Sequence, residues 1–142
     1  TQPGDIVDQR GNVLGTHDGV AFYTIGQRKG LGIAAPAPLY VTSLNAAKNQ
    51  VVVGSADAVY AHELTAQKIS WTMWDTLKEK RLVHAKIRYG KREAPAMIEA
   101  YSGENVHVRF AEPQRAVTPG QSVVFYEDDI VLGGGIIDRV IA

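Results

Sequence analysis

The 142 residues carry fifteen basic and fifteen acidic side chains, with 45% hydrophobic and 21% charged residues, a composition typical of a globular protein and not of a disordered one. The chain has no cysteine, which excludes disulfide-stapled folds, thiolate metal sites and thiol nucleophiles and makes a reducing cytosol the expected compartment. No apolar run approaches the roughly 18 residues that a membrane span needs, so we expect a cytoplasmic protein without membrane contact.

The first half of the chain, residues 1–66, is rich in glycine and alanine and predicts a small β-rich domain. One helical turn is expected within residues 19–29, where glycines keep any helix short. Residues 38–44 read as a strand, residues 45–49 form a polar turn, and residues 50–54 return as a second strand. This pattern predicts a hairpin with a longer loop.

The second half, residues 67–142, predicts a regular series of strands separated by short polar turns. The expected strands are residues 81–89, 96–101, 105–110, 121–126 and 130–137. Their spacing of about ten residues is typical of a closed or nearly closed antiparallel β-barrel. The sequence therefore predicts a mostly all-β protein with two domains and a boundary near residues 64–68.

The segment FYTIGQRKGLGI, residues 22–33, combines two aromatic rings, three glycines and two cations. It lacks the GxxxxGK[ST] pattern of a nucleotide phosphate loop. Backbone amides beside glycines, together with Arg28 and Lys29, would suit an anion such as an RNA phosphate. An ordinary structural turn fits the same residues, so both interpretations stay open at this point.

Residues 78–92 contain seven of the fifteen basic side chains and one acid, Glu79, so the charge is unevenly distributed although its sum is zero. As a strand, this segment directs Lys86 and Arg88 to one face, with Tyr89 at the strand end. Arginine binds phosphate through two parallel hydrogen bonds, and tyrosine stacks on an unpaired base. An RNA-binding face and a solvated strand face both fit this pattern.

No group of residues predicts a catalytic or metal site. The histidines are not spaced as metal ligands, and neither HExxH nor GxSxG occurs; they are His17, His62, His84 and His107. The three consecutive glycines at 133–135 lie within an expected strand and indicate a bulge or the close approach of another backbone segment.

Four segments resemble one family, the tRNA-specific 2-thiouridylases (MnmA family). They are GDIVDQRGNVLGTHDGVAFYTIGQRKGLGI, PLYV, KIRYGKREAPA and VRFAEPQRAVTPGQSVVFYEDDIVLGGGII, which follow one another in this order between Gly4 and Ile137. The resemblance implies the central domain of that family in residues 1–66. It implies the family's C-terminal β-barrel, which is similar to domain 2 of translation elongation factors, in residues 67–142.

The resemblance also implies a chemistry. In this family ATP with Mg activates the wobble uridine of tRNA by adenylation, and a cysteine persulfide then supplies the sulfur of 2-thiouridine. The PP-loop and the two cysteines are expected in an N-terminal domain, so no cofactor is expected within this chain. The implied partners are tRNA, that N-terminal domain and a persulfide sulfur-donor protein.

Five residues carry over from the family's motifs. The Arg-Tyr pair of KIRY and the glutamine of TPGQ contact tRNA in the family, which implies this role for Arg88, Tyr89 and Gln121. The GQRKG signature of the central domain implies that Arg28 and Lys29 are tRNA-side residues. We therefore expect an RNA-binding portion of a sulfurtransferase that is inactive by itself. The alternatives are a protein-interaction barrel that binds the sulfur donor or another partner and, third, an autonomous enzyme.

Overall fold

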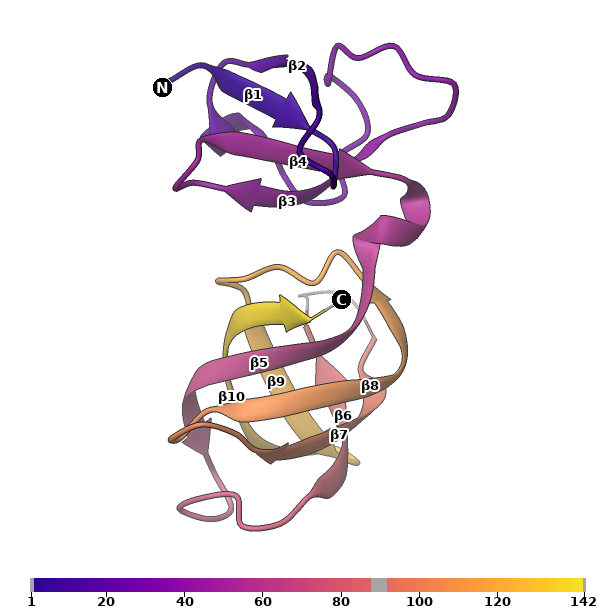
Figure 1. The fold of residues 1–142 in the computed structure, drawn as a ribbon. Coiled ribbons are helices and arrows are strands. Elements are labelled where there is room, and N and C mark those ends of the chain that lie inside the picture. The colour runs from indigo at the N-terminus through magenta and orange to yellow at the C-terminus, as the bar shows by residue number, and fades with distance from the viewer. Residues whose placement is uncertain (1, 88–91, 142) are drawn as a thin grey trace. The chain divides into compact units, whose positions relative to one another are not determined.

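The computed structural model describes residues 2–87 and 92–141 of the chain. It is built almost entirely of β-strands, which divide into two compact units, Thr1–Tyr60 and Ala61–Ala142 (Figure 1). The mostly all-β fold expected from the sequence is confirmed. The boundary expected near residues 64–68 falls inside strand β5 (Tyr60–Trp71), which runs unbroken through that region. No helix in the described part of the chain is long and apolar enough to cross a membrane.

The first unit is a four-stranded sheet with the order β2–β1–β4–β3 (Figure 1). Its strands are β1 (Gly4–Val7), β2 (Val13–His17), β3 (Tyr40–Asn45) and β4 (Gln50–Gly54). β1 pairs antiparallel with β2 and parallel with β4, whereas β3 and β4 form the expected antiparallel hairpin. The expected helical turn is the 3-10 turn η1 (Val20–Phe22), and a second one, η2 (Ala56–Val59), follows β4.

One face of this sheet is covered. Ile6, Val41, Val51 and Val53 are completely buried, and on β4 the two buried valines alternate with more exposed residues, as expected for a strand with one covered face. The segment between η1 and β3 also contributes two buried side chains, Ile25 and Leu31. The glycine-rich segment is therefore part of the packed domain and not a loose loop.

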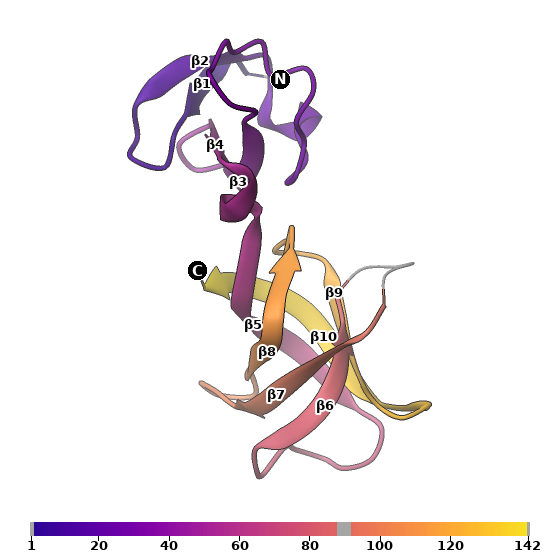
Figure 2. The same cartoon turned by 90° about the vertical axis from the view of Figure 1, so that its right-hand side faces the viewer.

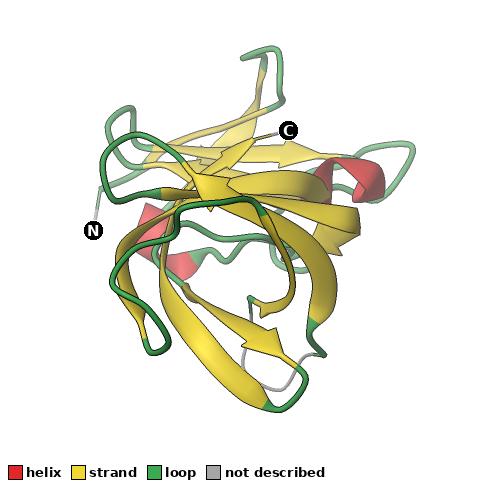
Figure 3. Ribbon diagram, turned by 90° about the horizontal axis from the view of Figure 1, so that it is seen from below, coloured by secondary structure: helices red, strands yellow, loops and turns green. Residues whose placement is uncertain are grey.

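The second unit is a closed barrel with the strand order β10–β5–β8–β7–β6–β9 (Figure 2). Its other strands are β6 (Arg81–Lys86), β7 (Ala94–Ala100), β8 (Val106–Arg115), β9 (Ser122–Glu127) and β10 (Ile130–Ile141). Figure 3, a view from below, shows these strands curving around the barrel centre. The antiparallel barrel expected from the strand spacing is confirmed, and each of the five expected strands overlaps one of β6 to β10.

Apolar side chains fill the barrel and seal one of its ends. The most deeply buried are Leu64, Ile98, Val108, Val123, Phe125, Leu132 and Ile137. Trp71 stacks on Phe125 with ring centroids 5.7 Å apart, and Trp74 lies 5.5 Å from Trp71. The loop after β5 therefore closes the barrel end at which β6 begins.

The glycines of β10 bring three backbone segments together. A Cβ on Gly134 would lie 2.6 Å from the carbonyl oxygen of Val123, and one on Gly135 would lie 2.5 Å from that of Gln67. Val123 belongs to β9 and Gln67 to β5, so β10 approaches both neighbours too closely for a side chain at these positions. The close backbone approach expected at residues 133–135 is confirmed.

Candidate nucleic-acid interface

The glycine-rich segment is a loop that is held by hydrogen bonds of Gln27. The Gln27 side chain accepts a hydrogen bond from the Thr24 amide at 3.0 Å and donates one to the Lys29 carbonyl at 2.9 Å. The backbone joins it to the edge of β3, because the Gly26 amide donates to the Val41 carbonyl (2.7 Å) and the Val41 amide donates to the Gln27 carbonyl (2.9 Å). The loop backbone is therefore fixed on both sides of Arg28.

Arg28 and Lys29 are exposed at the tip of this loop. Gly30, which follows them, has a φ of 78°, a left-handed conformation that favours glycine and turns the chain back. Beside Arg28, residues 30–39 line an open hollow of about 590 Å³. The structural-turn interpretation describes this backbone well, and the turn leaves both cations accessible to an anion.

The two aromatic rings before the loop have different environments. Tyr23 packs edge-on against the buried His17, with ring centroids 5.7 Å apart, and His17 Nε2 lies 2.8 Å from the Asn49 carbonyl oxygen. Phe22 is 66% exposed. The half-buried Tyr23 therefore packs against the domain interior, whereas the Phe22 ring is accessible to a binding partner.

Gln121 is exposed and leaves the barrel from a rigid turn. Its amide donates to the Thr118 carbonyl at 3.2 Å, which closes a turn whose third residue, Gly120, has a φ of 91°. The Gly120 amide donates to the Ile137 carbonyl, and the Ile137 amide donates to the Gln121 carbonyl, both at 2.8 Å. The backbone of Gln121 is already held by β10. Binding a ligand through the Gln121 side chain therefore costs little backbone conformational entropy.

Several cations lie at the same barrel end as Gln121. Lys86, the last residue of β6, pairs with Val124 near the start of β9. Arg92 precedes β7, and Arg139 lies two residues beyond Ile137 in β10. We call these residues, Lys86, Arg92, Gln121 and Arg139, the Gln121 rim. Arg88 and Tyr89, the other two predicted barrel contacts, lie outside the described residues.

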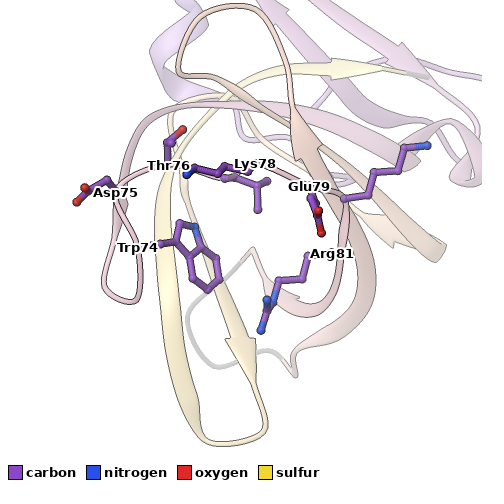
Figure 4. A pocket seen from close by; sticks show the side chains of 8 residues that line it. Trp74, Asp75, Thr76, Lys78, Glu79 and Arg81 are labelled. Carbon is purple, nitrogen blue, oxygen red and sulfur yellow. The ribbon is translucent and has the colours of Figure 1, made fainter.

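At the opposite barrel end, Arg81 and Lys80 have carboxylate partners. Arg81 Nη2 lies 2.6 Å from Glu127 Oε2, and the Arg81 guanidinium lies over the Trp74 ring, 4.9 Å from its centroid. Lys80 Nζ lies 3.9 Å from Glu99 Oε2. Figure 4 shows Trp74 and Arg81 among the side chains that line a hollow of about 660 Å³ at this end.

By contrast, Lys86, Arg92 and Arg139 form no ion pair with any other residue that the structure describes. The basic run at 78–92 is therefore not one patch. Strand β6 separates Arg81 from Lys86 by roughly 17 Å, at about 3.3 Å per residue. The cations near Arg81 stabilise the barrel end, while those at the Gln121 rim are available to an anionic partner.

Two family models match the chain, one on each unit. The tRNA methyl transferase PRC-barrel domain matches residues 1–55, and the aminomethyltransferase beta-barrel domain matches residues 61–137. The chain belongs to the aminomethyltransferase β-barrel domain family. The first match ends and the second begins close to the division between Tyr60 and Ala61. The family models and the structure therefore divide the chain at nearly the same place.

The curated relatives are tRNA-specific 2-thiouridylases. The chain is 54% identical over 136 residues to MnmA of Acetivibrio thermocellus, which covers 96% of this chain and 38% of the relative. It is 49% identical over 140 residues to MnmA of Clostridium beijerinckii, covering 99% and 39% of the two chains. MnmA 2 of Clostridium botulinum is 50% identical over 136 residues. The resemblance to the central and C-terminal domains of this family is confirmed, and the chain spans less than two fifths of the relatives' length.

One member of the Gln121 rim could not be selected from the sequence. Arg139 follows Asp138 in an otherwise apolar stretch, far in sequence from the basic run, and only the pairing of β10 with β5 and β9 places it at the barrel end of Gln121. Arg92 belongs to the basic run at 78–92, but the sequence does not show that it lies at the barrel end of Gln121 and not at the end of Arg81. The structure brings Lys86, Arg92 and Gln121 together, while Arg28 and Lys29 belong to the other unit.

Proposed function

We propose that this chain is the RNA-binding portion of a tRNA-uridine 2-sulfurtransferase, the enzyme that makes 2-thiouridine at the wobble position of tRNA. The observation that carries the proposal is the similarity of at least 96% of the chain to tRNA-specific 2-thiouridylases. The chain has no cysteine and no phosphate-loop motif. ATP with Mg, the adenylation step and the persulfide transfer are therefore assigned to the part of the relatives that this chain does not match.

The role of this chain is to bind and orient the tRNA. Arg28 and Lys29, on the fixed loop of the first unit, contact backbone phosphates, and each such contact releases condensed counterions. At the barrel, Gln121 hydrogen-bonds the RNA from its rigid turn, and Lys86, Arg92 and Arg139, which have no ion pair among the described residues, supply positive charge. Arg88 binds a phosphate or a base edge, and Tyr89 packs on a ribose or a base.

The test is the affinity of the 142-residue chain for a transcribed tRNA with a wobble uridine, measured across a salt series. We expect affinity that falls with rising salt, and each of Arg28→Ala, Lys29→Ala and Arg88→Ala should reduce the slope of log affinity against log salt by about one unit. Tyr89→Ala should cost ~1–3 kcal/mol of binding with little change in slope.

The control is Lys48→Ala, which removes an exposed lysine from the turn between β3 and β4 in the same unit as Arg28. Its slope and affinity should match those of the unmodified chain. A chain that is folded but does not bind the tRNA, or variants that all bind like the unmodified chain, would contradict the proposal.

Binding of a protein, such as the persulfide sulfur donor, is the second candidate. It is favoured by Met73, Ile130 and Val131, which are 57%, 53% and 43% exposed. The Thr72 hydroxyl donates to the Val131 carbonyl at 2.5 Å, so the loop that carries Met73 is joined to the start of β10, which carries Ile130 and Val131. Binding of a purified persulfide donor that is lost in Ile130→Ser, without any tRNA binding by the chain, would favour this candidate over the first.

A further inference from the structure

The outer surface of β6 carries one exposed leucine beside two polar side chains. Val83 and Ala85 point into the barrel and are 4% and 1% exposed. Because side chains alternate along a strand, Leu82, His84 and Lys86 lie on the outside. Leu82 is 72% exposed and His84 is exposed, whereas Lys86 is half-buried.

β9 continues this surface across the strand pair. His84 pairs with Tyr126 and Lys86 pairs with Val124. Paired residues on one face have Cβ atoms about 4.5–5.5 Å apart, so the side chains of His84 and Tyr126 extend from neighbouring positions. We call Leu82, His84, Lys86, Val124 and Tyr126 the β6–β9 face.

Among the residues that the structure describes, the polar side chains of this face have no polar partner. In residues 2–87 and 92–141, no side-chain hydrogen bond, ion pair or ring contact involves His84, Lys86 or Tyr126. The face is continuous with the Gln121 rim, because Lys86 belongs to both and Gln121 immediately precedes β9. An RNA strand held at that rim therefore reaches the face without crossing another element.

We propose that the β6–β9 face binds an unpaired nucleotide of the RNA, with its base against Tyr126 and His84 and a neighbouring phosphate on Lys86. The proposal rests on the proposed function and adds a base-stacking surface to its phosphate contacts. Planar rings beside an uncompensated cation are the combination with which proteins bind single-stranded nucleic acid. Leu82, next to His84 on the same face, excludes water from the edge of the stacked base.

The first test compares variants of the 142-residue chain in affinity for the same transcribed tRNA. Tyr126→Ala should weaken binding roughly 5- to 150-fold at an unchanged salt slope, because stacking involves no counterion release. Tyr126→Phe keeps the ring and should bind within about twofold of the unmodified chain. Lys86→Ala should reduce the salt slope by about one unit.

Two matched controls lie elsewhere on the barrel. Tyr101 is a 52% exposed tyrosine that follows β7, and Lys78 is an exposed lysine at the opposite barrel end. Tyr101→Ala and Lys78→Ala should leave both affinity and salt slope unchanged. These controls separate an effect of the β6–β9 face from the loss of any exposed ring or charge.

A second measurement does not depend on the folding of a variant. The unmodified chain is irradiated with a tRNA containing 5-iodouridine, and cross-linked peptides are identified by mass spectrometry. Cross-links to Tyr126 or His84, but not to Tyr101, support the proposal. Binding of tRNA with cross-links elsewhere, and with folded Tyr126→Ala and His84→Ala variants of normal affinity, overturns it and leaves the proposed function standing. If the chain binds no tRNA, both this proposal and the proposed function are overturned. If Leu82→Ser abolishes the binding of a protein partner and leaves the RNA affinity unchanged, the β6–β9 face is a protein-docking surface instead.

Discussion

Opposite outer surfaces of one barrel arrange their charges in different ways. On β5 and β8, Glu63 Oε1 accepts a hydrogen bond from Arg109 Nε at 2.9 Å and forms an ion pair with Arg109 Nη2 at 2.9 Å. His107 Nε2 lies 3.3 Å from the same oxygen. On β6 and β9, the described structure gives Lys86 and His84 no carboxylate partner. The net charge of zero does not reveal this difference. The charges on β5 and β8 pair with one another, whereas Lys86 on β6 has no carboxylate partner among the described residues and is free to bind an anion.

The largest expected effect comes from Gly134→Ala, which acts on both surfaces at once because β10 joins β5 to β9. The added Cβ would lie 2.6 Å from the Val123 carbonyl oxygen, so the strands must move apart. We expect destabilisation near the upper end of ~1–3 kcal/mol, the usual cost of overpacking. Urea unfolding followed by the fluorescence of Trp71 and Trp74 measures it.

Gly103→Ala is the control for this glycine. Gly103 has a φ of 65°, and no atom lies within 4 Å of its added Cβ. The cost there is backbone strain alone, about 1–2 kcal/mol. If Gly134→Ala is as stable as Gly103→Ala, the contact of β10 with β9 can accommodate a side chain, which would contradict this prediction.

Arg81→Ala should have an intermediate effect on stability and none on RNA binding. It removes the ion pair with Glu127 and the cation–π contact with Trp74, each worth roughly 0.5–1 kcal/mol at a partly exposed site. We expect a loss of about 1 kcal/mol in urea unfolding, with tRNA affinity within about twofold. Weaker tRNA binding by a folded Arg81→Ala variant would mean that this barrel end also contacts RNA.

Glu63→Gln should alter the pH dependence of stability. The hydrogen bond from the Arg109 side chain holds the pKa of Glu63 below its ordinary value of 4.5, with smaller help from the His107 and Arg109 charges. A carboxyl whose pKa is lowered on folding stabilises the protein above its unfolded pKa, and the contribution is lost as the pH falls through the folded value. Urea midpoints between pH 3 and pH 7 should therefore fall less steeply with acidification in Glu63→Gln than in the unmodified chain. Parallel curves would show that this ion pair does not stabilise the fold.

The smallest expected effect on stability is that of Leu82→Ala, on the β6–β9 face. Leu82 is 72% exposed, so its truncation removes little buried surface and should change the unfolding free energy by less than about 0.5 kcal/mol. The same urea experiment measures it. A loss above 1 kcal/mol would mean that Leu82 packs against the barrel and is not available to a ligand.

The parts of the fold with a simple alternation could be predicted from the sequence. The hairpin of β3 and β4 follows from Val51 and Val53 pointing inward, and the turn ends at Asn49, whose φ of 53° suits asparagine. Strand β5 could not be predicted in this way. Its outer positions carry His62 and Glu63, and Lys68 has a φ of 53°, which interrupts the two-residue period. β1 and β2 are too short, at four and five residues, to establish a period at all.

The candidate site could be predicted only in part, because the local sequence pattern does not determine the order of the strands in the barrel. The resemblance selected Gln121, which the structure places directly after the turn at Gly120 and before β9. The expected alternation of the β6 segment is confirmed from Leu82 to Ile87. His84 and Tyr126 lie more than forty residues apart in the sequence, and the register of β6 with β9 is what makes them neighbours. A surface made of residues from several strands needs that register.

The charged residues of β5 also matter during translation, because β5 is synthesised before the strands with which it pairs. β5 is the first barrel strand to leave the ribosome, yet its partners are β8 and β10, and its residue Glu63 pairs with Ile141. During translation its backbone edges stay open until those later strands exist, and an open edge invites pairing with other nascent chains. Charged residues along such a strand act as gatekeepers against aggregation. Glu63 and Lys68 place such charges on β5, and Glu63 forms its ion pairs with Arg109 and His107 only once β8 has joined the barrel.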